Sequence, residues 1–186
     1  MYYLGIDPSL TATGVYFLST DKANEPDVCY EINTSKAEFS SSLHRVDYIA
    51  SKIVEDIKKY NPVNIVMEDY FTGRQAGTVI KLAELGTMVR FRILEAGFSF
   101  FVSPPTKLKK FVSGSGSCSK DIMLKNVYKR WDVDTNSNNI ADACGLAYMS
   151  QAIYNKVNKI DQKLTKYEEE SIKPYSDDVK VRMYKL

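Results

Sequence analysis

The chain opens with a short apolar run that ends in a carboxylate. Residues 2–6 (Tyr-Tyr-Leu-Gly-Ile) lead into Asp7, and the residues after it, 8–14, begin with Pro8 and end with Gly14. An apolar run that breaks at Pro and Gly predicts a buried strand followed by a turn. Asp7 then lies at a sheet edge, where ligands of open α/β sheets usually bind. Taken alone, an Asp before Pro more simply caps the turn with its own side chain.

Two further stretches of the chain carry acids in a similar way. The apolar run 64–67 ends at Glu68 and Asp69, and Asn139 and Asp142 are three residues apart near the start of a predicted helix, on one face of it. Two strand-end acids and a helix-borne acid would converge on one point. Clustered carboxylates repel one another unless cations compensate them, and hard oxygen ligands select Mg²⁺ or Mn²⁺. Two such ions about 3.5–4 Å apart are the usual machinery for in-line displacement at phosphorus.

The hydrophobic pattern predicts an α/β fold. We expect strands at 2–6, 15–18, 28–32, 64–68 and 98–102, and helices at 42–60, 76–96, 106–112, 120–131 and 139–155. The first three strands predict an antiparallel meander with strand 2–6 in the sheet interior. Strand 64–68 is expected to run parallel to strand 2–6 because a helix intervenes. This arrangement would place Asp7 and Glu68 side by side at one sheet edge.

Two of the predicted helices carry apolar positions that we expect to face the core. In helix 42–60 these positions are Leu43, Val46, Ile49, Ala50, Ile53, Val54 and Ile57. In helix 76–96 they are Val79, Leu82, Ala83, Met88 and Leu94. The only histidine, His44, falls on the solvent side of the first helix, which argues against Ser-His-Asp, Cys-His and His-zinc chemistry.

Composition and charge indicate one globular domain and leave the partner open. With 186 residues, 44% hydrophobic and 26% charged, the chain is long enough to bury a sizeable core. A net charge of +2 is too small to indicate a nucleic-acid partner by itself. The charge is unevenly distributed, however, because the segment 107–120 contains four lysines and no acid.

The cysteines and the N-terminal residues bear on the compartment. Cys29, Cys118 and Cys144 are an odd number without metal-ligand spacing, which favours reduced thiols over disulfides or a zinc site. No apolar run approaches membrane-spanning length, and a strand stands where a signal peptide would lie. We therefore expect a cytoplasmic protein without a membrane partner.

Short motifs follow one another in a fixed order over about the first 150 residues. They are Gly5-Ile6-Asp7-Pro8-Ser9, Glu68 with Phe71 three residues on, Lys81-Leu82-Ala83-Glu84-Leu85-Gly86, Pro105-Thr106-Lys107-Leu108-Lys109, Gly114-Ser115-Gly116 followed by Lys120, and Ala141-Asp142-Ala143. No single motif is decisive, but the ordered set resembles the RuvC-type Holliday junction resolvases of the RNase H-like superfamily. Similar small resolvases occur in phages, and the Asn-x-x-Asp-Ala pattern at 139–143 fits such a member, whose location would be the host cytoplasm.

The resemblance implies the fold, the domain organisation and the assembly. It implies an RNase H-like fold with a five-stranded mixed sheet of strand order 3-2-1-4-5 and helices on both faces. The nuclease domain would span 1–155, and 156–186 would be a charged C-terminal extension. In similar resolvases the helix that corresponds to 76–96 contributes to a dimer interface, so we expect a homodimer.

The resemblance also implies a reaction and a set of ligands. It implies a structure-selective endonuclease that cleaves four-way DNA junctions by two-metal-ion hydrolysis, with other branched DNA left open as a substrate. Asp7 would bridge two Mg²⁺ or Mn²⁺ ions, Glu68 and Asp142 would each hold one side, and Asn139 would occupy the fourth ligand position.

Asn139 is the main departure from the family pattern. Bacterial RuvC proteins have an aspartate there, whereas an asparagine offers one neutral carbonyl oxygen. The site could work with weaker binding of one ion, it could be damaged, or Asp132 or Asp134 could supply the missing charge. We favour a working site because the other three acids remain, and we expect Asn139→Asp to lower the metal requirement.

Basic and aromatic residues are the candidate DNA contacts. By resemblance, Lys120 approaches the scissile phosphate, Lys109 belongs to the DNA-binding face, and Phe71 stacks on a base near the junction centre. Further candidate phosphate contacts are Arg74, Lys107 and Lys110. The alternative for each lysine is a solvated side chain, and for Phe71 a ring tucked onto the core.

Two other functions compete with junction cleavage. The first is a branched-DNA-binding protein of weak or no nuclease activity, in which Asn139 marks lost catalysis. The second is a phosphotransferase of the actin and sugar-kinase type, because Gly5-Ile6-Asp7 leads into a Thr-rich turn. That class needs a second lobe and another glycine-rich phosphate motif, and the sequence shows neither. The glycine-containing loop at 114–116 lacks the P-loop pattern. We therefore expect no nucleotide cofactor.

Overall fold

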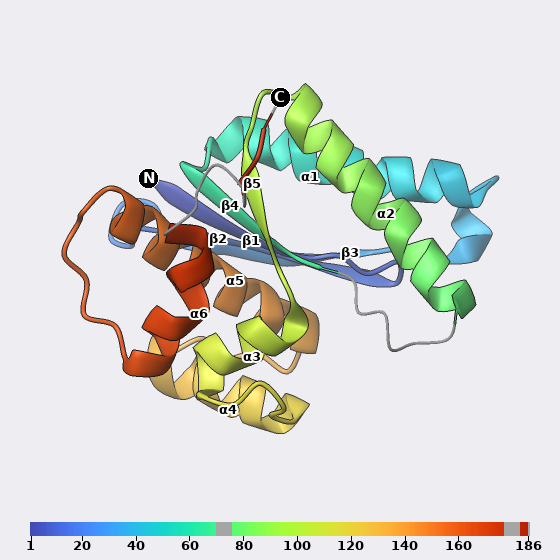
Figure 1. Cartoon of the computed structure of the whole chain (residues 1–186). Helices are drawn as coiled ribbons and strands as arrows, with labels where there is room; N and C mark the ends of the chain where they lie inside the picture. Colours follow the sequence, from blue (N-terminus) through green and yellow to red (C-terminus); the bar gives the residue numbers. More distant parts are fainter. Residues whose placement is uncertain (70–75, 177–182, 186) are drawn as a thin grey trace.

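The computed structural model describes residues 1–69, 76–176 and 183–185. Within these residues the chain forms one mixed six-stranded sheet with the order β3-β2-β1-β4-β5-β6 (Figure 1). The strands are β1 (Tyr2–Asp7), β2 (Ala12–Ser19), β3 (Val28–Asn33), β4 (Asn64–Glu68), β5 (Phe100–Ser103) and β6 (Met183–Tyr184). The expected five-stranded order is confirmed, and β6 extends it at the β5 edge.

Helices cover both faces of this sheet (Figure 1). They are the 3₁₀ helix η1 (Lys36–Glu38), α1 (Ser42–Tyr60), α2 (Ala76–Glu95), α3 (Pro105–Ser113), α4 (Lys120–Trp131), α5 (Asn138–Val157) and α6 (Lys166–Ser176). α1 and α2 lie on one face, and the other four α-helices lie on the opposite face. Three helices begin at serines whose hydroxyls accept a backbone hydrogen bond, namely Ser41, Ser119 and Ser137.

The strand register brings five residues into one row across the sheet. Asp7 lies opposite Gly14, Gly14 lies opposite Glu31, and Glu68 lies opposite Ser103. Because Ile6 and Met67 pair in parallel, the next residues of those strands, Asp7 and Glu68, also lie side by side. Side chains of directly paired residues point to the same face of a sheet, so this row faces α5. We call Glu31, Gly14, Asp7, Glu68 and Ser103 the end row.

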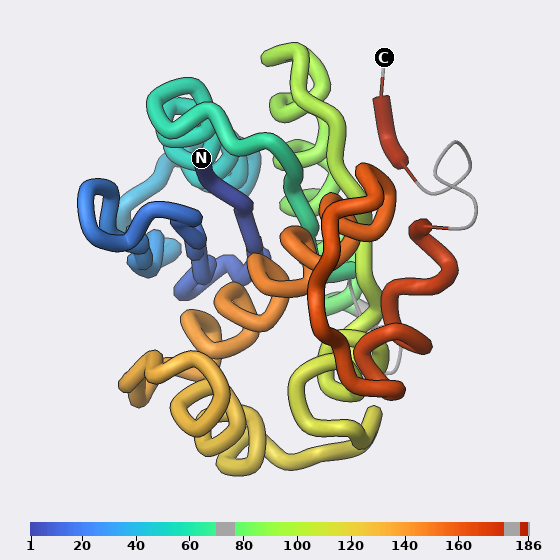
Figure 2. The backbone as a smooth tube through the Cα atoms, turned by 90° about the vertical axis from the view of Figure 1, so that its left-hand side faces the viewer, coloured from blue at the N-terminus to red at the C-terminus, as the bar shows by residue number. Residues whose placement is uncertain are grey.

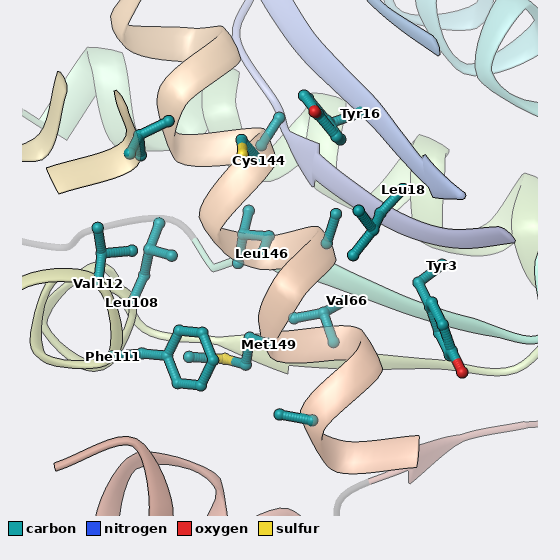
Figure 3. Packing of buried hydrophobic residues seen from close by; sticks show 14 of the residues in the cluster. Tyr3, Tyr16, Leu18, Val66, Leu108, Phe111, Val112, Cys144, Leu146 and Met149 are labelled. Carbon is teal, nitrogen blue, oxygen red and sulfur yellow. The ribbon is translucent and has the colours of Figure 1, made fainter. Parts of the chain in front are cut away.

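α5 is the central helix of the face to which the end row points. It buries side chains on most of its circumference, as expected for a helix enclosed by other elements. Figure 3 shows α5 between the sheet and α3, with labelled side chains that include Tyr3, Val66, Leu108, Val112, Cys144, Leu146 and Met149. The opposite face of the sheet packs Leu4 and Ile6 against α1 and α2.

Two glycines set how closely α5 approaches the sheet. A Cβ atom on Gly5 would lie 2.0 Å from the Ala143 carbonyl oxygen and 2.4 Å from the Ala147 nitrogen. A Cβ atom on Gly14 would lie 2.2 Å from the Asn139 carbonyl oxygen. The backbone of α5 therefore rests directly on β1 and β2, which places the start of the helix over the end row.

Most predicted elements are confirmed within a few residues, but one core residue of α1 is placed wrongly and the packing positions of α2 are only partly right. Leu43 was expected in the core, yet its side chain is 62% exposed. In α2 the buried hydrophobic residues are Leu85, Val89 and Ile93. The five expected positions are partly buried, and of these Met88 and Leu94 pack against the core. The reason is that α2 has two apolar faces, and the pattern alone does not tell which of them meets the sheet. The second face, with Ile80 and Phe91, lies in an open groove beside Leu43.

The C-terminal segment is more closely packed than its charge suggests. α6 lies against α3 and α5 (Figure 2), and it buries Ile172 and Tyr175 in the same core as α5. The carboxylate of Glu168 is buried and forms an ion pair with Arg130, which also donates to the carbonyls of Phe111 and Val112. The division into 1–155 and 156–186 remains a prediction, but α6 is part of the folded core.

The contact between Gly5 and α5 predicts a large effect of one added methyl group. Gly5→Ala forces the methyl group into the α5 backbone, so we expect a loss of about 3 kcal/mol in the free energy of unfolding. Gly77→Ala is the matched control, because a Cβ atom there meets nothing within 4 Å and alanine favours helix. Urea unfolding monitored by circular dichroism measures both. Equal stability of Gly5→Ala and wild type would contradict the close contact.

Candidate active site

A cavity of about 340 Å³ lies at the carboxyl ends of β1 and β4, in front of the end row. Its walls come from β1, β4, α2, α3, α4 and α5, so residues distant in sequence meet there. The charged and amide residues that line it are Asp7, Glu68, Asp69, Arg90, Lys109, Lys120, Asn138, Asn139 and Asp142. The structure therefore brings together all four predicted metal ligands and two of the predicted basic residues.

Burial and neighbouring charges shift the pKa values of two carboxyl groups in this cavity. Burial raises the pKa of Glu68 well above its ordinary value, and the charges of Asp7 and Asp142 and a hydrogen bond to Asp7 raise it further. Burial also raises the pKa of Asp142 from 3.8 to about 6, although Lys109 and Lys120 oppose this shift. Carboxyl groups with strongly raised pKa values in a cleft are typical of functional sites.

Asn139 has an acidic partner that the sequence did not indicate. Its Nδ2 donates a hydrogen bond to Oε1 of Glu31 at 3.0 Å, and Ser137 Oγ donates to the same oxygen at 2.5 Å. Asp132 and Asp134, the acids considered for this role, are exposed and do not line the cavity. Glu31 could be found only from the register of β1, β2 and β3, because 24 residues separate it from Asp7 in the chain.

The predicted basic residues divide into two groups. Lys109 and Lys120 line the cavity, and both lower the pKa of Asp142, so both lie near its carboxyl group. Lys107 and Lys110 contact α6 instead: Lys107 Nζ lies 5.1 Å from the Tyr175 ring centroid, and Lys110 Nζ lies 2.7 Å from Glu170 Oε2. The remaining two predicted DNA contacts, Phe71 and Arg74, fall outside the described residues.

Arg90 is a third cation of the cavity wall, and the sequence did not indicate it. It lies within α2, and its Nη2 donates to Asp69 Oδ1 at 2.7 Å. Its guanidinium group also lies 5.9 Å from the ring of Tyr184 in β6. The sequence around Arg90 does not distinguish it from arginines on the surface, because the face of α2 on which it lies is set by how the helix packs against the sheet.

The cavity offers oxygen donors, but a complete ligand cluster is not formed by acids alone. Among residues 1–69, 76–176 and 183–185, no three His, Cys, Asp or Glu side chains form a group that could hold a metal ion by themselves. Additional oxygen is available, since Asn138 Oδ1 is buried at the cavity and has no hydrogen-bond partner within the described part of the chain. Burying an amide oxygen without a hydrogen-bond donor costs free energy of folding. The position of Asn138 Oδ1 therefore suits contact with a cation or with a donor group of a ligand.

Acids at the ends of two adjacent strands, beneath a helix that carries another acid, match the arrangement that the resemblance to RuvC-type resolvases implies. The profile of the family described as crossover junction endodeoxyribonuclease RuvC matches residues 3–150, so the chain belongs to the RuvC family. The sugar-kinase alternative is thereby excluded. In the segments that the structure describes, no helix has the length and apolar character needed to cross a membrane.

Curated relatives agree with this assignment, and a solved structure has the same fold. The RuvC protein of Brachyspira hyodysenteriae is 27% identical over 84% of this chain and 97% of its own length. That of Parvibaculum lavamentivorans is 30% identical over 78% of this chain and 83% of its own length. Thermus thermophilus RuvC in complex with a Holliday junction substrate has the same fold, with a TM-score of 0.69, 23% identity, and coverage of 83% of this chain and 94% of that one.

Because the pKa of Asp142 is raised in the folded state, its ionisation should lower the free energy of unfolding. Without metal, the folded state holds a proton on Asp142 up to about pH 6, while the unfolded chain releases it near pH 3.8. The contribution of this group to stability is therefore present below pH 3.8 and is lost as the pH rises to about 6. At pH 7, Asp142→Asn should be more stable than wild type by up to about 3 kcal/mol, and the difference should vanish near pH 4.

Urea unfolding in EDTA between pH 4 and pH 8 measures this difference. The matched control is Asp134→Asn, which removes an exposed acid outside the cavity and should change little. An Asp142→Asn protein that is equally or less stable than wild type at pH 7 would contradict a destabilising buried carboxylate.

Proposed function

We propose that this chain is a structure-selective DNA endonuclease that cleaves four-way (Holliday) junctions. The observation that carries the proposal is that Asp7, Glu68 and Asp142 meet in one cavity beside Lys109 and Lys120. Membership of the RuvC family and the names of its relatives supply the substrate class. Other branched DNA, such as flaps and forks, remains open as a further substrate.

The donors of the cavity fit Mg²⁺ or Mn²⁺. Carboxylate and amide oxygens are hard ligands. Burial, and then repulsion by Asp7 and Asp142, raise the pKa of Glu68, and a cation between the acids would relieve that repulsion. Two bound ions would activate a water molecule and neutralise charge on the phosphate. We infer that Asp7, Glu68, Asp142 and Asn139 would hold these ions, with Asp7 serving both, Glu68 serving one, and Asp142 and Asn139 serving the other.

The protein's own groups orient the substrate around these ligands. Lys120, at the start of α4, would stabilise negative charge at the scissile phosphate, and Lys109 would hold an adjacent phosphate. Phe71 and Arg74 are proposed as a stacking ring and a phosphate contact. Lys107 and Lys110 remain candidates, but DNA would have to compete with their contacts to Tyr175 and Glu170.

An exposed apolar groove supports the homodimer. Side chains of α1 and α2 form it, and its large exposed members are Leu43, Ile80 and Phe91, which are 62%, 60% and 57% exposed. Contiguous apolar surface of this kind marks an interaction site. Two copies joined by a two-fold axis would present two cavities, as cutting two strands of a symmetric junction requires.

The free thiols of Cys29, Cys118 and Cys144 fit a reducing cytoplasm, which would be that of the host if a phage encodes the chain.

One specific observation favours the alternative of a junction-binding protein with weak or no cleavage. The side chain at position 139 is neutral, and its amide nitrogen is held by Glu31. Binding without cleavage would require only the lysines and the surrounding DNA-binding face, whereas cleavage requires the acids. Variants of the acids therefore separate the two functions.

Loss of one carboxylate charge should stop cleavage and spare binding. We expect Asp7→Asn, Glu68→Gln and Asp142→Asn each to reduce cleavage of a synthetic four-way junction at least about 100-fold, because metal is held less well. Junction affinity in Ca²⁺, measured by electrophoretic mobility shift, should stay within about threefold, because most phosphate contacts remain. Wild-type protein that binds the junction but leaves it intact with Mg²⁺ or Mn²⁺ would instead support the binding protein.

A charge in the apolar groove should disrupt the dimer. Phe91→Glu and Ile80→Glu each bury a carboxylate if the groove is the interface, so sedimentation should show monomers at micromolar concentration. Ile160→Glu is the control, since Ile160 is exposed outside the groove and the change should leave the dimer intact. Dimers of unchanged stability in both groove variants would place the interface elsewhere.

A further inference from the structure

Glu31 is an acid of the end row that neither the family motifs nor the cavity lining includes. It is two strands away from Asp7, in the same row and on the same face of the sheet. Gly14 stands between them and has no side chain, and the Asn139 backbone occupies the space above it. The row thus carries a carboxylate on each side of the place where α5 begins.

Hydrogen bonds connect Glu31 to the amide of Asn139. Oε1 of Glu31 accepts from Asn139 Nδ2 and from Ser137 Oγ. Ser137 also caps α5, since its hydroxyl accepts from the backbone nitrogen of Ile140 at 3.1 Å. An amide whose nitrogen is held from one side presents its oxygen to the other, and Asn139 lines the cavity.

Glu31 also places a carboxylate next to the neutral side chain of Asn139. An asparagine at position 139 supplies a metal-ligand oxygen but no charge, whereas a carboxylate behind it supplies charge at a distance of one hydrogen bond. Groups that orient a metal ligand through a hydrogen bond commonly change metal affinity by about 10- to 100-fold. Glu31 is placed to act in this way.

We propose that Glu31 is a positioning residue for the metal site: it fixes the Asn139 amide so that Oδ1 faces the cavity, and it supplies the negative charge that Asn139 lacks. This inference rests on the metal-dependent function proposed above. Glu31 and Asn139 together take the place of a single aspartate, and the site is a working one.

The pairing reverses the effect expected for Asn139→Asp from the sequence. With Glu31 at hydrogen-bond distance, an aspartate at position 139 would place two carboxylates against each other. The substitution should therefore weaken metal binding in the natural background. In the Glu31→Gln background it should be favourable, because the glutamine amide introduced at position 31 can donate to the carboxylate introduced at position 139. The number of charges in the pair then stays the same as in the natural protein.

Mn²⁺ titration of the DNA-free full-length protein by calorimetry tests this scheme, with Mg²⁺-dependent junction cleavage as the second readout. We expect Glu31→Gln and Asn139→Asp each to raise the apparent Kd for Mn²⁺ about tenfold. The double variant Glu31→Gln/Asn139→Asp should return to within about twofold of wild type. Glu55→Gln removes an exposed acid from α1 on the opposite face, where ion pairs contribute little, and should match wild type.

The possible outcomes are distinguishable from one another. Single variants that bind Mn²⁺ like wild type, while Asp7→Asn loses binding, would overturn the role of Glu31 and leave the metal site standing. Single variants that are impaired and not rescued in the double variant would mean that Glu31 acts only as a partner of the α5 cap, which also overturns the proposal. Wild-type protein that binds no Mn²⁺ would refute the metal-dependent function itself and the inference with it.

Discussion

The contact between the backbones of β1 and α5 is the constraint on which the site depends. Gly5 and Gly14 let the helix rest on the sheet, and this contact places Asp142 and Asn139 over the end row that contains Asp7 and Glu68. Burying these acids together opposes folding: burial raises the pKa of Glu68 and of Asp142, and the charges of Asp7 and Asp142 raise the pKa of Glu68 further. The apolar side chains buried around α5 stabilise the fold and thereby offset the cost of holding these acids together.

The direction in which the lysines of α3 point determines which of them line the cavity. Lys109 faces the cavity, while Lys110 pairs with Glu170 and Lys107 lies over Tyr175. Arg130 of α4 pairs with Glu168 of α6 and donates to two carbonyls of α3, so it joins the three helices. Because α6 packs against one side of α3, the other side is left for the cavity. The C-terminal helix is thereby part of the arrangement that sets which cations face the substrate.

The sequence predicted Asp7, Glu68 and Asp142 because each stands where a strand ends or a helix begins, which local pattern reveals. It did not predict Glu31 or Arg90, because their positions follow from strand register and helix rotation, which are long-range properties. Leu43 was wrongly placed in the core because an apolar stripe that faces a groove has the same period as one that faces a sheet. β6 was missed because two residues are too few to show any periodicity.

The end row and α5 should together form one divalent-cation site. Diffraction from crystals soaked in Mn²⁺, with data collected at an energy where manganese scatters anomalously, tests this claim most directly. We predict two anomalous peaks in the cavity, both in contact with Asp7, one shared with Glu68 and the other with Asp142 and the Asn139 oxygen. Crystals that hold Mn²⁺ only outside this cavity, or nowhere at saturating concentration, would contradict the account.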